Sequence, residues 1–198
     1  MDRIVLASSN PGKLAEFNQL FADVGLAVVA QASLGVADAD ETGLTFIENA
    51  LLKARHAAAV TGLPALADDS GICVDHLRGA PGLYSARYSG GHGDSAANNA
   101  KLLREMESVP EARRGAFFIC VLALVRHADD PAPLIAEGRW HGRVLDAPRG
   151  PGGFGYDPLF LPGGLAQSAA ELDPATKNRL SHRGQALAVL HARLAGWQ

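Results

Sequence analysis

Four short polar motifs, each beside an apolar run, contain the side chains of this chain that could do chemistry. Ser8-Ser9-Asn10-Pro11-Gly12-Lys13 combines small donors, a glycine and a lysine, which suit a phosphate group. Asp68-Asp69-Ser70-Gly71 provides paired carboxylates, which suit a metal ion. Phe154-Gly155-Tyr156-Asp157-Pro158 and Ser181-His182-Arg183 provide aromatic rings and hydrogen-bonding groups, which suit a base. Together the four motifs predict a nucleoside triphosphate as the substrate.

The first motif lies where a strand should give way to a helix. Ile4–Ala7 is a short apolar run typical of a buried strand, and helical spacing of apolar residues follows from Leu14 to Val24 before Gly25. A strand, a polar turn and a helix aim backbone N–H groups at an anion. The motif lacks the first glycine and the Ser/Thr of a Walker A loop. A helix cap with a solvated lysine is the alternative.

The paired carboxylates follow a predicted strand, Pro64–Ala67, and precede another, Ile72–Val74. Adjacent side chains at a strand end face opposite sides, so one carboxylate can brace the turn while the other faces a substrate. Magnesium needs only one or two carboxylates, with phosphate oxygens and waters completing its shell. Glu41, in an acidic segment, is the best second ligand. An Asx-turn pair at a hairpin is the alternative.

A lysine on the second predicted helix is a further candidate phosphate contact. Thr45 and Glu48 form a capping box that opens this helix, and Gly62 follows its end at Thr61. Lys53 lies one turn beyond Asn49 and can reach the phosphates. A position on a solvated helix face is equally consistent with the sequence.

The last two motifs are candidates for base recognition. An aromatic ring of Phe154 or Tyr156 can stack on a purine, and Asp157 can accept a hydrogen bond from a ring N–H. Ser181 is a candidate N-cap, which places His182 and Arg183 in the positively polarised first turn of a helix. Cations there oppose the helix dipole, so we expect them to be placed for a ligand, with Lys177 nearby in sequence. For the motif at residues 154–158, the alternative is a packed aromatic residue beside a turn.

Length and composition favour one soluble α/β domain over residues 1–198. The net charge of −3 argues against a nucleic-acid partner. No apolar run approaches ~18 residues, which predicts no membrane span. Met1 runs straight into the first strand without a cleavage-site pattern, which predicts no signal peptide. Cys73 and Cys120 lie in apolar runs typical of reduced, buried cysteines, so we expect a cytoplasmic protein.

The remaining pattern predicts elements around a mixed sheet. We expect strands at 27–30, 116–126 and 133–140, the last two being antiparallel neighbours. Further helices are expected from Asp94 or Ser95 to about Met106, and from Ser181 to about Leu194. Residues 78–93 should form an ordered functional loop, and residues 150–155 a glycine-rich turn.

The chain resembles the inosine/xanthosine triphosphate pyrophosphatases from Ile4 to about Leu194. The resemblance rests on the four motifs above and on Glu41-Thr42-Gly43, Phe46-x-Glu48-Asn49-Ala50 and Gly79-x-Pro81-Gly82-x-Tyr84-Ser85-Ala86-Arg87. It implies an elongated mixed β-sheet flanked by helices in two lobes, with a central substrate cleft. It also implies a homodimer, Mg²⁺ dependence, and hydrolysis of non-standard purine triphosphates (ITP, dITP, XTP) to the monophosphate and pyrophosphate.

The resemblance assigns roles by position. Phosphate contacts would be Ser8, Ser9, Asn10, Pro11, Gly12, Lys13 and Lys53, and Ser70 would be a further substrate contact. Glu41 and Asp69 would form the metal and water site, with Asp69 orienting or deprotonating the water. Base recognition would fall to Phe154, Gly155, Tyr156, Asp157, Lys177, His182 and Arg183.

Two alternatives remain open. One is the septum-inhibition family, which acts on thymidine or uridine triphosphates and also opens with a strand and a polar turn. It lacks the Phe-Gly-Tyr-Asp and Ser-His-Arg elements. The other is a non-catalytic nucleotide sensor, against which the presence of Asp69 and Glu41 argues.

Overall fold

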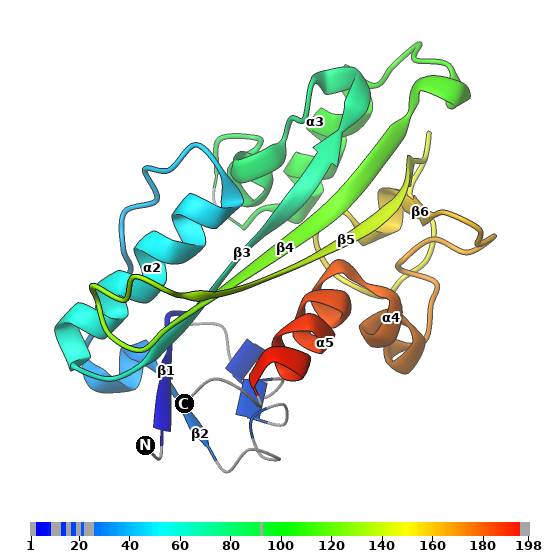
Figure 1. Cartoon of the computed structure of the whole chain (residues 1–198). Helices are drawn as coiled ribbons and strands as arrows, with labels where there is room; N and C mark the ends of the chain where they lie inside the picture. The colour runs from blue at the N-terminus through cyan, green and yellow to red at the C-terminus, as the bar shows by residue number, and fades with distance from the viewer. Residues whose placement is uncertain are drawn as a thin grey trace. The chain divides into compact units, whose positions relative to one another are not determined.

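The computed structural model describes residues 3–8, 13–14, 17–18, 21, 26–91 and 93–194. Within these residues the strands form one six-stranded sheet in the order β2-β1-β3-β4-β5-β6 (Figure 1). The strands are β1 (Arg3–Leu6), β2 (Ala27–Ala30), β3 (Ala65–Val74), β4 (Gly115–Val125), β5 (Leu134–Val144) and β6 (Phe160–Pro162). The helices that lie wholly within the described residues are α2 (Phe46–Thr61), α3 (Ser95–Glu105), α4 (Pro174–Leu180) and α5 (His182–Leu194), and the same residues contain five short 3-10 turns.

The sheet is mixed, as predicted. β1 pairs in parallel with both β2 and β3, with Val5 opposite Val29 on one side and Ala65 on the other. β5 pairs antiparallel with β6. Figure 1 shows α2 on one side of the sheet formed by residues 65–69, 120–125 and 134–138, and residues 186–194 of α5 on the other. The expected sheet flanked by helices is therefore confirmed, while the central cleft stays a prediction.

The chain divides into two compact units. Unit 1 comprises residues 1–69, 120–138 and 186–198, and unit 2 comprises residues 70–119 and 139–185. Each has a buried apolar core of its own: Ile4, Leu66 and Leu190 belong to the first, and Ile72 and Phe160 to the second. That residues 1–198 form one domain stays a prediction.

The first unit's long helix begins and ends where its sequence signals lie. The Thr45 side chain accepts a hydrogen bond from Glu48 N at 3.2 Å, and Glu48 Oε2 accepts one from Leu44 N at 2.8 Å. Gly62 ends the helix in the left-handed conformation, φ 66°, and its N–H bonds to Ala58 O. These contacts satisfy backbone groups that a helix end leaves free, so the start of α2, which carries Lys53, is well defined.

The prediction of two short strands around the paired carboxylates is wrong. β3 runs without interruption from Ala65 to Val74, through Asp68, Asp69 and Ser70. A strand can continue through these residues because each carboxylate forms an ion pair with a lysine of the same unit. Successive side chains of a strand still face opposite sides, so the expected divergence of the two carboxylates is preserved.

Other differences lie in short elements that carry little periodicity. The sequence pattern did not predict α4 or β6, and β5 extends to Val144 rather than ending at Trp140. The expected loop at 78–93 contains a 3-10 turn, Gly82–Arg87. The helix expected from Leu14 onward is helical at residues 13, 14, 17, 18 and 21, and its other residues lie outside the described part.

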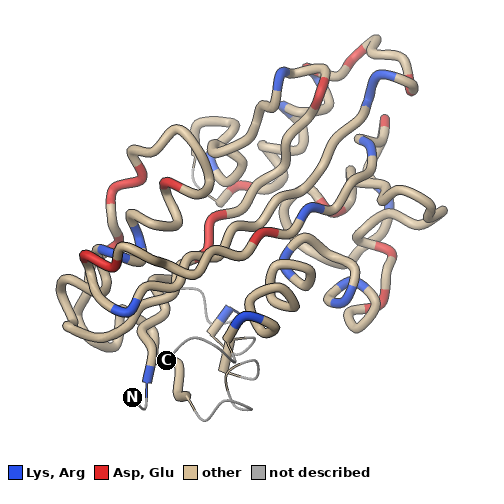
Figure 2. Tube along the Cα trace, in the orientation of Figure 1, with Lys and Arg blue, Asp and Glu red and all other residues tan. Residues whose placement is uncertain are grey.

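Charge is distributed over both units. Acidic and basic residues are interspersed along the trace in Figure 2. Within the described residues, no helix combines the length and apolar character needed to cross a membrane.

Candidate active site

The segment that carries Glu41 runs antiparallel to α2 and is held by it. The ring Nε2 of His56 lies 3.0 Å from the carbonyl oxygen of Ala37, and Gly43 N donates to Asn49 Oδ1 at 2.8 Å. These two contacts bracket residue 41 and place it opposite residue 53 of the helix. A Cβ at Gly43 would lie 2.7 Å from Asn49 Oδ1, so this approach requires glycine.

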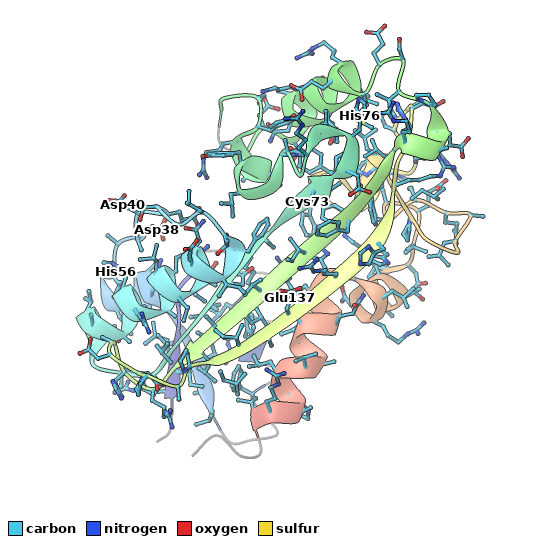
Figure 3. All side chains as sticks on the ribbon, turned by 45° about the horizontal axis from the view of Figure 1, so that its top comes forward. Asp38, Asp40, His56, Cys73, His76 and Glu137 are labelled. Atoms are coloured by element: carbon cyan, nitrogen blue, oxygen red, sulfur yellow. The ribbon has the colours of Figure 1, made fainter. Side chains whose placement is uncertain are left out.

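Three acidic residues lie on this segment, and their environments differ. Figure 3 shows Asp38 and Asp40 beside the helix that carries His56. Asp38 accepts a hydrogen bond from Gln31 at 2.5 Å, and Asp40 is exposed. Glu41 is half-buried and accepts a hydrogen bond from Lys53 at 2.7 Å. The geometry therefore singles out Glu41, as the sequence interpretation did.

Lys53 joins Glu41 to Asp69. Its Nζ atom lies 2.7 Å from Glu41 Oε1 and 3.0 Å from Asp69 Oδ1, so one ammonium group bridges two carboxylates from different elements. The side chains of Lys53 and Asp69 are only 15% and 12% exposed. The three residues are a compact, partly desolvated charged cluster within unit 1.

Burial acts in opposite directions on the pKa values of Lys53 and Asp69. Burial lowers the pKa of Lys53, but Asp69 and Glu41 outweigh it and hold that pKa above its ordinary value. Burial raises the pKa of the Asp69 carboxyl; Lys53 opposes the shift, and the neighbouring Glu41 carboxylate adds to it. The charged form of a lysine between two carboxylates is stabilised more than the charged form of an aspartate between one cation and one anion. Asp69 is therefore a stronger proton acceptor than an ordinary aspartate.

The carboxylates of this cluster fit a divalent cation. Asp69 Oδ2 is buried, and the Asp69 carboxyl is contacted by Lys53 and by the Asn49 side chain. The described part of the chain contains no group of three or more His, Cys, Asp or Glu side chains arranged as a metal site. Two neighbouring carboxylates suit Mg²⁺, which takes the rest of its shell from phosphate oxygens and waters. Glu41 and Asp69 would be the protein's ligands.

A buried asparagine beside this cluster, Asn49, belongs to the motifs of the resemblance but was assigned no role from the sequence. Asn49 is 2% exposed, and besides accepting from Gly43 N its side chain lowers the pKa of Asp69 through a hydrogen bond. A signal that could have pointed to its role is that it is the polar residue on the otherwise alanine-rich buried face of α2. Asn49 connects the segment of Glu41 to the carboxylate of Asp69.

Lys13 contacts the other carboxylate of the pair. Its Nζ donates to Asp68 Oδ1 at 2.8 Å, and the Asp68 side chain is only 1% exposed. The half-buried Ser8 follows β1, while Ser9, Asn10, Pro11 and Gly12 lie outside the described residues. Ser70 follows Asp69 on β3 and is half-buried. The phosphate roles of these residues stay predictions.

In unit 2, the turn at residues 153–157 presents one aromatic ring. Phe154 is 64% exposed, and Lys177 Nζ lies 4.4 Å from its ring centroid. The Asp157 carboxylate accepts a hydrogen bond from Phe154 N at 2.6 Å and forms a short ion pair with Lys177. Three of the residues predicted for base recognition are thus brought together.

Tyr156, by contrast, points into the protein. It is 5% exposed, and its hydroxyl donates to the carbonyl oxygen of Ser85 at 2.8 Å. Of the two aromatic residues in the motif, Phe154 is therefore the one with an accessible face.

The start of α5 is closely packed. Ser181 Oγ accepts a hydrogen bond from Gly184 N at 3.2 Å, which confirms the predicted N-cap. His182 stacks on Phe118 with ring centroids 4.8 Å apart and an interplanar angle of 11°. A Cβ at Gly184 would lie 1.7 Å from the carbonyl oxygen of Asn178, so α4 and α5 meet at a glycine. Arg183, on the same turn, is half-buried.

These contacts define an α/β protein with a lysine–carboxylate cluster in one unit and an aromatic turn with a lysine in the other. The chain belongs to the Ham1 family, whose sequence model matches residues 4–193. It is similar to the dITP/XTP pyrophosphatase of Ralstonia nicotianae, with 62% identity over 98% of this chain and 97% of that protein.

Solved structures agree with this assignment. A HAM1 protein from Coxiella burnetii superimposes with a TM-score of 0.95 at 49% identity, covering 99% of this chain and 100% of that one. The Staphylococcus aureus Ham1 protein gives a TM-score of 0.91 at 38% identity, again over 99% and 100% of the two chains.

Proposed function

We propose that this chain is a magnesium-dependent nucleoside triphosphate pyrophosphatase. Its substrates are dITP, XTP and ITP, and its products are the nucleoside monophosphate and pyrophosphate, which would clear deaminated purines from the nucleotide pool. The observation that carries the proposal is the bridge from Lys53 to Glu41 and Asp69 at 2.7 and 3.0 Å. The names of relatives such as the dITP/XTP pyrophosphatase at 62% identity support the substrate class.

The chemistry assigned to unit 1 is attack of water on the α-phosphorus. A bond forms from the water oxygen to phosphorus, the α–β anhydride bond breaks, and pyrophosphate leaves. Asp69 takes the proton of the water at its carboxylate, because its raised pKa brings it closer to that of an effective general base. Lys53 and Lys13 place positive charge where the phosphates gain negative charge. When bound by Glu41 and Asp69, Mg²⁺ supplies further neutralisation of the triphosphate.

The residues of unit 2 account for the choice of base. Phe154 stacks on the purine, since its ring is exposed and Lys177 lies against it. His182 and Arg183 donate hydrogen bonds to the 6-oxo group of hypoxanthine or xanthine. Adenine carries a 6-amino donor at that position, so donors would face each other, which costs ~1–3 kcal/mol when buried. We further propose a cytoplasmic homodimer that binds neither nucleic acid nor membranes.

A panel of triphosphates tests the proposal. Pyrophosphate release should be fast with dITP, XTP and ITP and slow with dATP and dTTP, in the presence of Mg²⁺. Binding of dITP without release of pyrophosphate would identify a nucleotide sensor instead. A preference for dTTP or UTP would assign the chain to pyrimidine substrates.

A further inference from the structure

Besides the contacts of Asp157 with Phe154 N and with Lys177, two hydrogen bonds join the turn that carries Phe154 to other segments of unit 2. The Tyr156 hydroxyl donates to Ser85 O at 2.8 Å, and Asn99 Nδ2 of α3 donates to Gly155 O at 2.9 Å. Gly153 and Gly155 both have positive φ, 73° and 58°. Two glycines give this backbone wide conformational freedom, so its observed shape depends on such bonds.

The acceptor of the Tyr156 hydroxyl is itself rigidly placed. Ser85 Oγ donates to Gly82 O at 2.6 Å and accepts from Ile72 N at 3.0 Å. The buried Asn98 of α3 accepts from Ser89 N at 2.7 Å and donates to Ser85 O at 3.4 Å. The 82–89 segment and α3 therefore form a fixed support for the aromatic turn, within unit 2.

The contacts of the Asn99 side chain leave one of its buried polar atoms without a hydrogen bond among the described residues. Its Oδ1 is buried and has no hydrogen-bond partner in the described part of the chain, while its Nδ2 bonds to Gly155 O. A buried acceptor without a partner destabilises the folded state. What the side chain does provide is a hold on the residue that follows Phe154.

We propose that Tyr156 and Asn99 are positioning residues for base recognition. They fix the 153–157 turn so that the exposed Phe154 ring presents its face to the purine. The inference rests on the proposed function, and it gives Tyr156 a role other than direct stacking. Losing either bond would let the turn leave its binding conformation, which would weaken binding of the base without altering the phosphate chemistry.

Tyr156→Phe and Asn99→Leu test the idea, with Tyr88→Phe as the matched control. The Tyr88 hydroxyl bonds to Glu105, the last residue of α3, and among the described residues no hydrogen bond joins that hydroxyl to the 153–157 turn. Steady-state hydrolysis of dITP should show KM raised about 2- to 12-fold in each test variant, the effect of one lost hydrogen bond. We expect kcat to stay within about twofold in both variants and the control to match wild type.

Two further measurements separate positioning from a general structural role. The inhibition constant of inorganic pyrophosphate, which lacks a base, should be unchanged in both test variants. The melting temperature of Asn99→Leu should equal or exceed that of wild type, because the substitution removes the unpartnered buried oxygen. An unchanged KM for dITP, or equal weakening of pyrophosphate, would overturn the proposal. Absence of dITP hydrolysis by wild type would instead refute the proposed function.

Discussion

Replacing Asp69 with Asn should nearly abolish turnover and yet leave the protein at least as stable. Asn keeps the shape of the side chain but removes its charge and its capacity to take a proton from water. General-base and metal contributions are each typically worth ~10²-fold or more, so kcat should fall by at least ~10²-fold. KM for dITP should stay within about an order of magnitude, because Lys13 and the base contacts remain.

The stability effect follows from the direction of the pKa shift. Burial raises the pKa of Asp69 above its ordinary value, against the opposing effect of Lys53. A carboxyl whose pKa is raised by folding lowers the free energy of unfolding only when it is ionised. This destabilisation is absent below the unfolded-state pKa and complete once the pH has risen through the folded-state pKa. Asp69→Asn removes that destabilisation. In metal-free protein its melting temperature should equal or exceed wild type at neutral pH, and the difference should shrink in acid.

Asp130→Asn is the matched control, a buried aspartate of the same unit with the opposite shift. Asp130 is 0% exposed and accepts hydrogen bonds from Arg126 and Ala132, and the Arg126 side chain holds its pKa well below the ordinary value. Its charge therefore stabilises the fold above the unfolded pKa, and this is lost as pH falls through the folded pKa. Removing it should cost ~1–3 kcal/mol at neutral pH while leaving kcat near wild type.

Pyrophosphate release at saturating Mg²⁺ and thermal melts over a pH series measure both effects. A variant that retains more than about a tenth of wild-type kcat would exclude Asp69 as the general base. If Asp69→Asn lost as much stability as Asp130→Asn, the ion pair with Lys53 would outweigh burial and the stability argument would be wrong.

Three further outcomes are expected. Excess chelator should stop pyrophosphate release, because a triphosphate with about four negative charges needs a cation beside two carboxylates; full activity in chelator would contradict the metal site. Turnover should rise toward alkaline pH, because a deprotonated water is the better nucleophile. Lys13→Ala should lower kcat/KM for dITP and dATP alike, whereas Arg183→Ala should lower the dITP-to-dATP ratio of kcat/KM by ~10- to 150-fold. An equal loss of kcat/KM on both substrates in Arg183→Ala would make Arg183 a phosphate or structural residue. Lys53→Met should move the acid limb of the pH profile of kcat/KM up by ~1–3 pH units, because it removes the cation that opposes the raised pKa of Asp69. The control Arg55→Met, on the same helix, should leave the profile in place. Identical profiles for the two variants would show that Lys53 does not act on Asp69.

Local signals in the sequence were sufficient for the elements with strong periodicity or strong caps. The Thr45–Glu48 cap and Gly62 correctly predicted the ends of α2, and Ser181 correctly predicted the start of α5. Such signals are read within one turn of backbone, so no distant contact is needed to interpret them. The short α4 and β6 carry too few residues for a pattern to emerge.

The sequence by itself determined which residues could do chemistry, the mixed α/β sheet and the family that the motifs resemble. Only the tertiary structure decided how those residues are used. It carried β3 through Asp68 and Asp69 because Lys13 and Lys53, distant in sequence, neutralise them. It buried Tyr156 and exposed Phe154, because the hydroxyl of Tyr156 meets a carbonyl some seventy residues earlier. Ion pairs and buried hydrogen bonds depend on which segments meet in space, and spacing along the chain does not specify that.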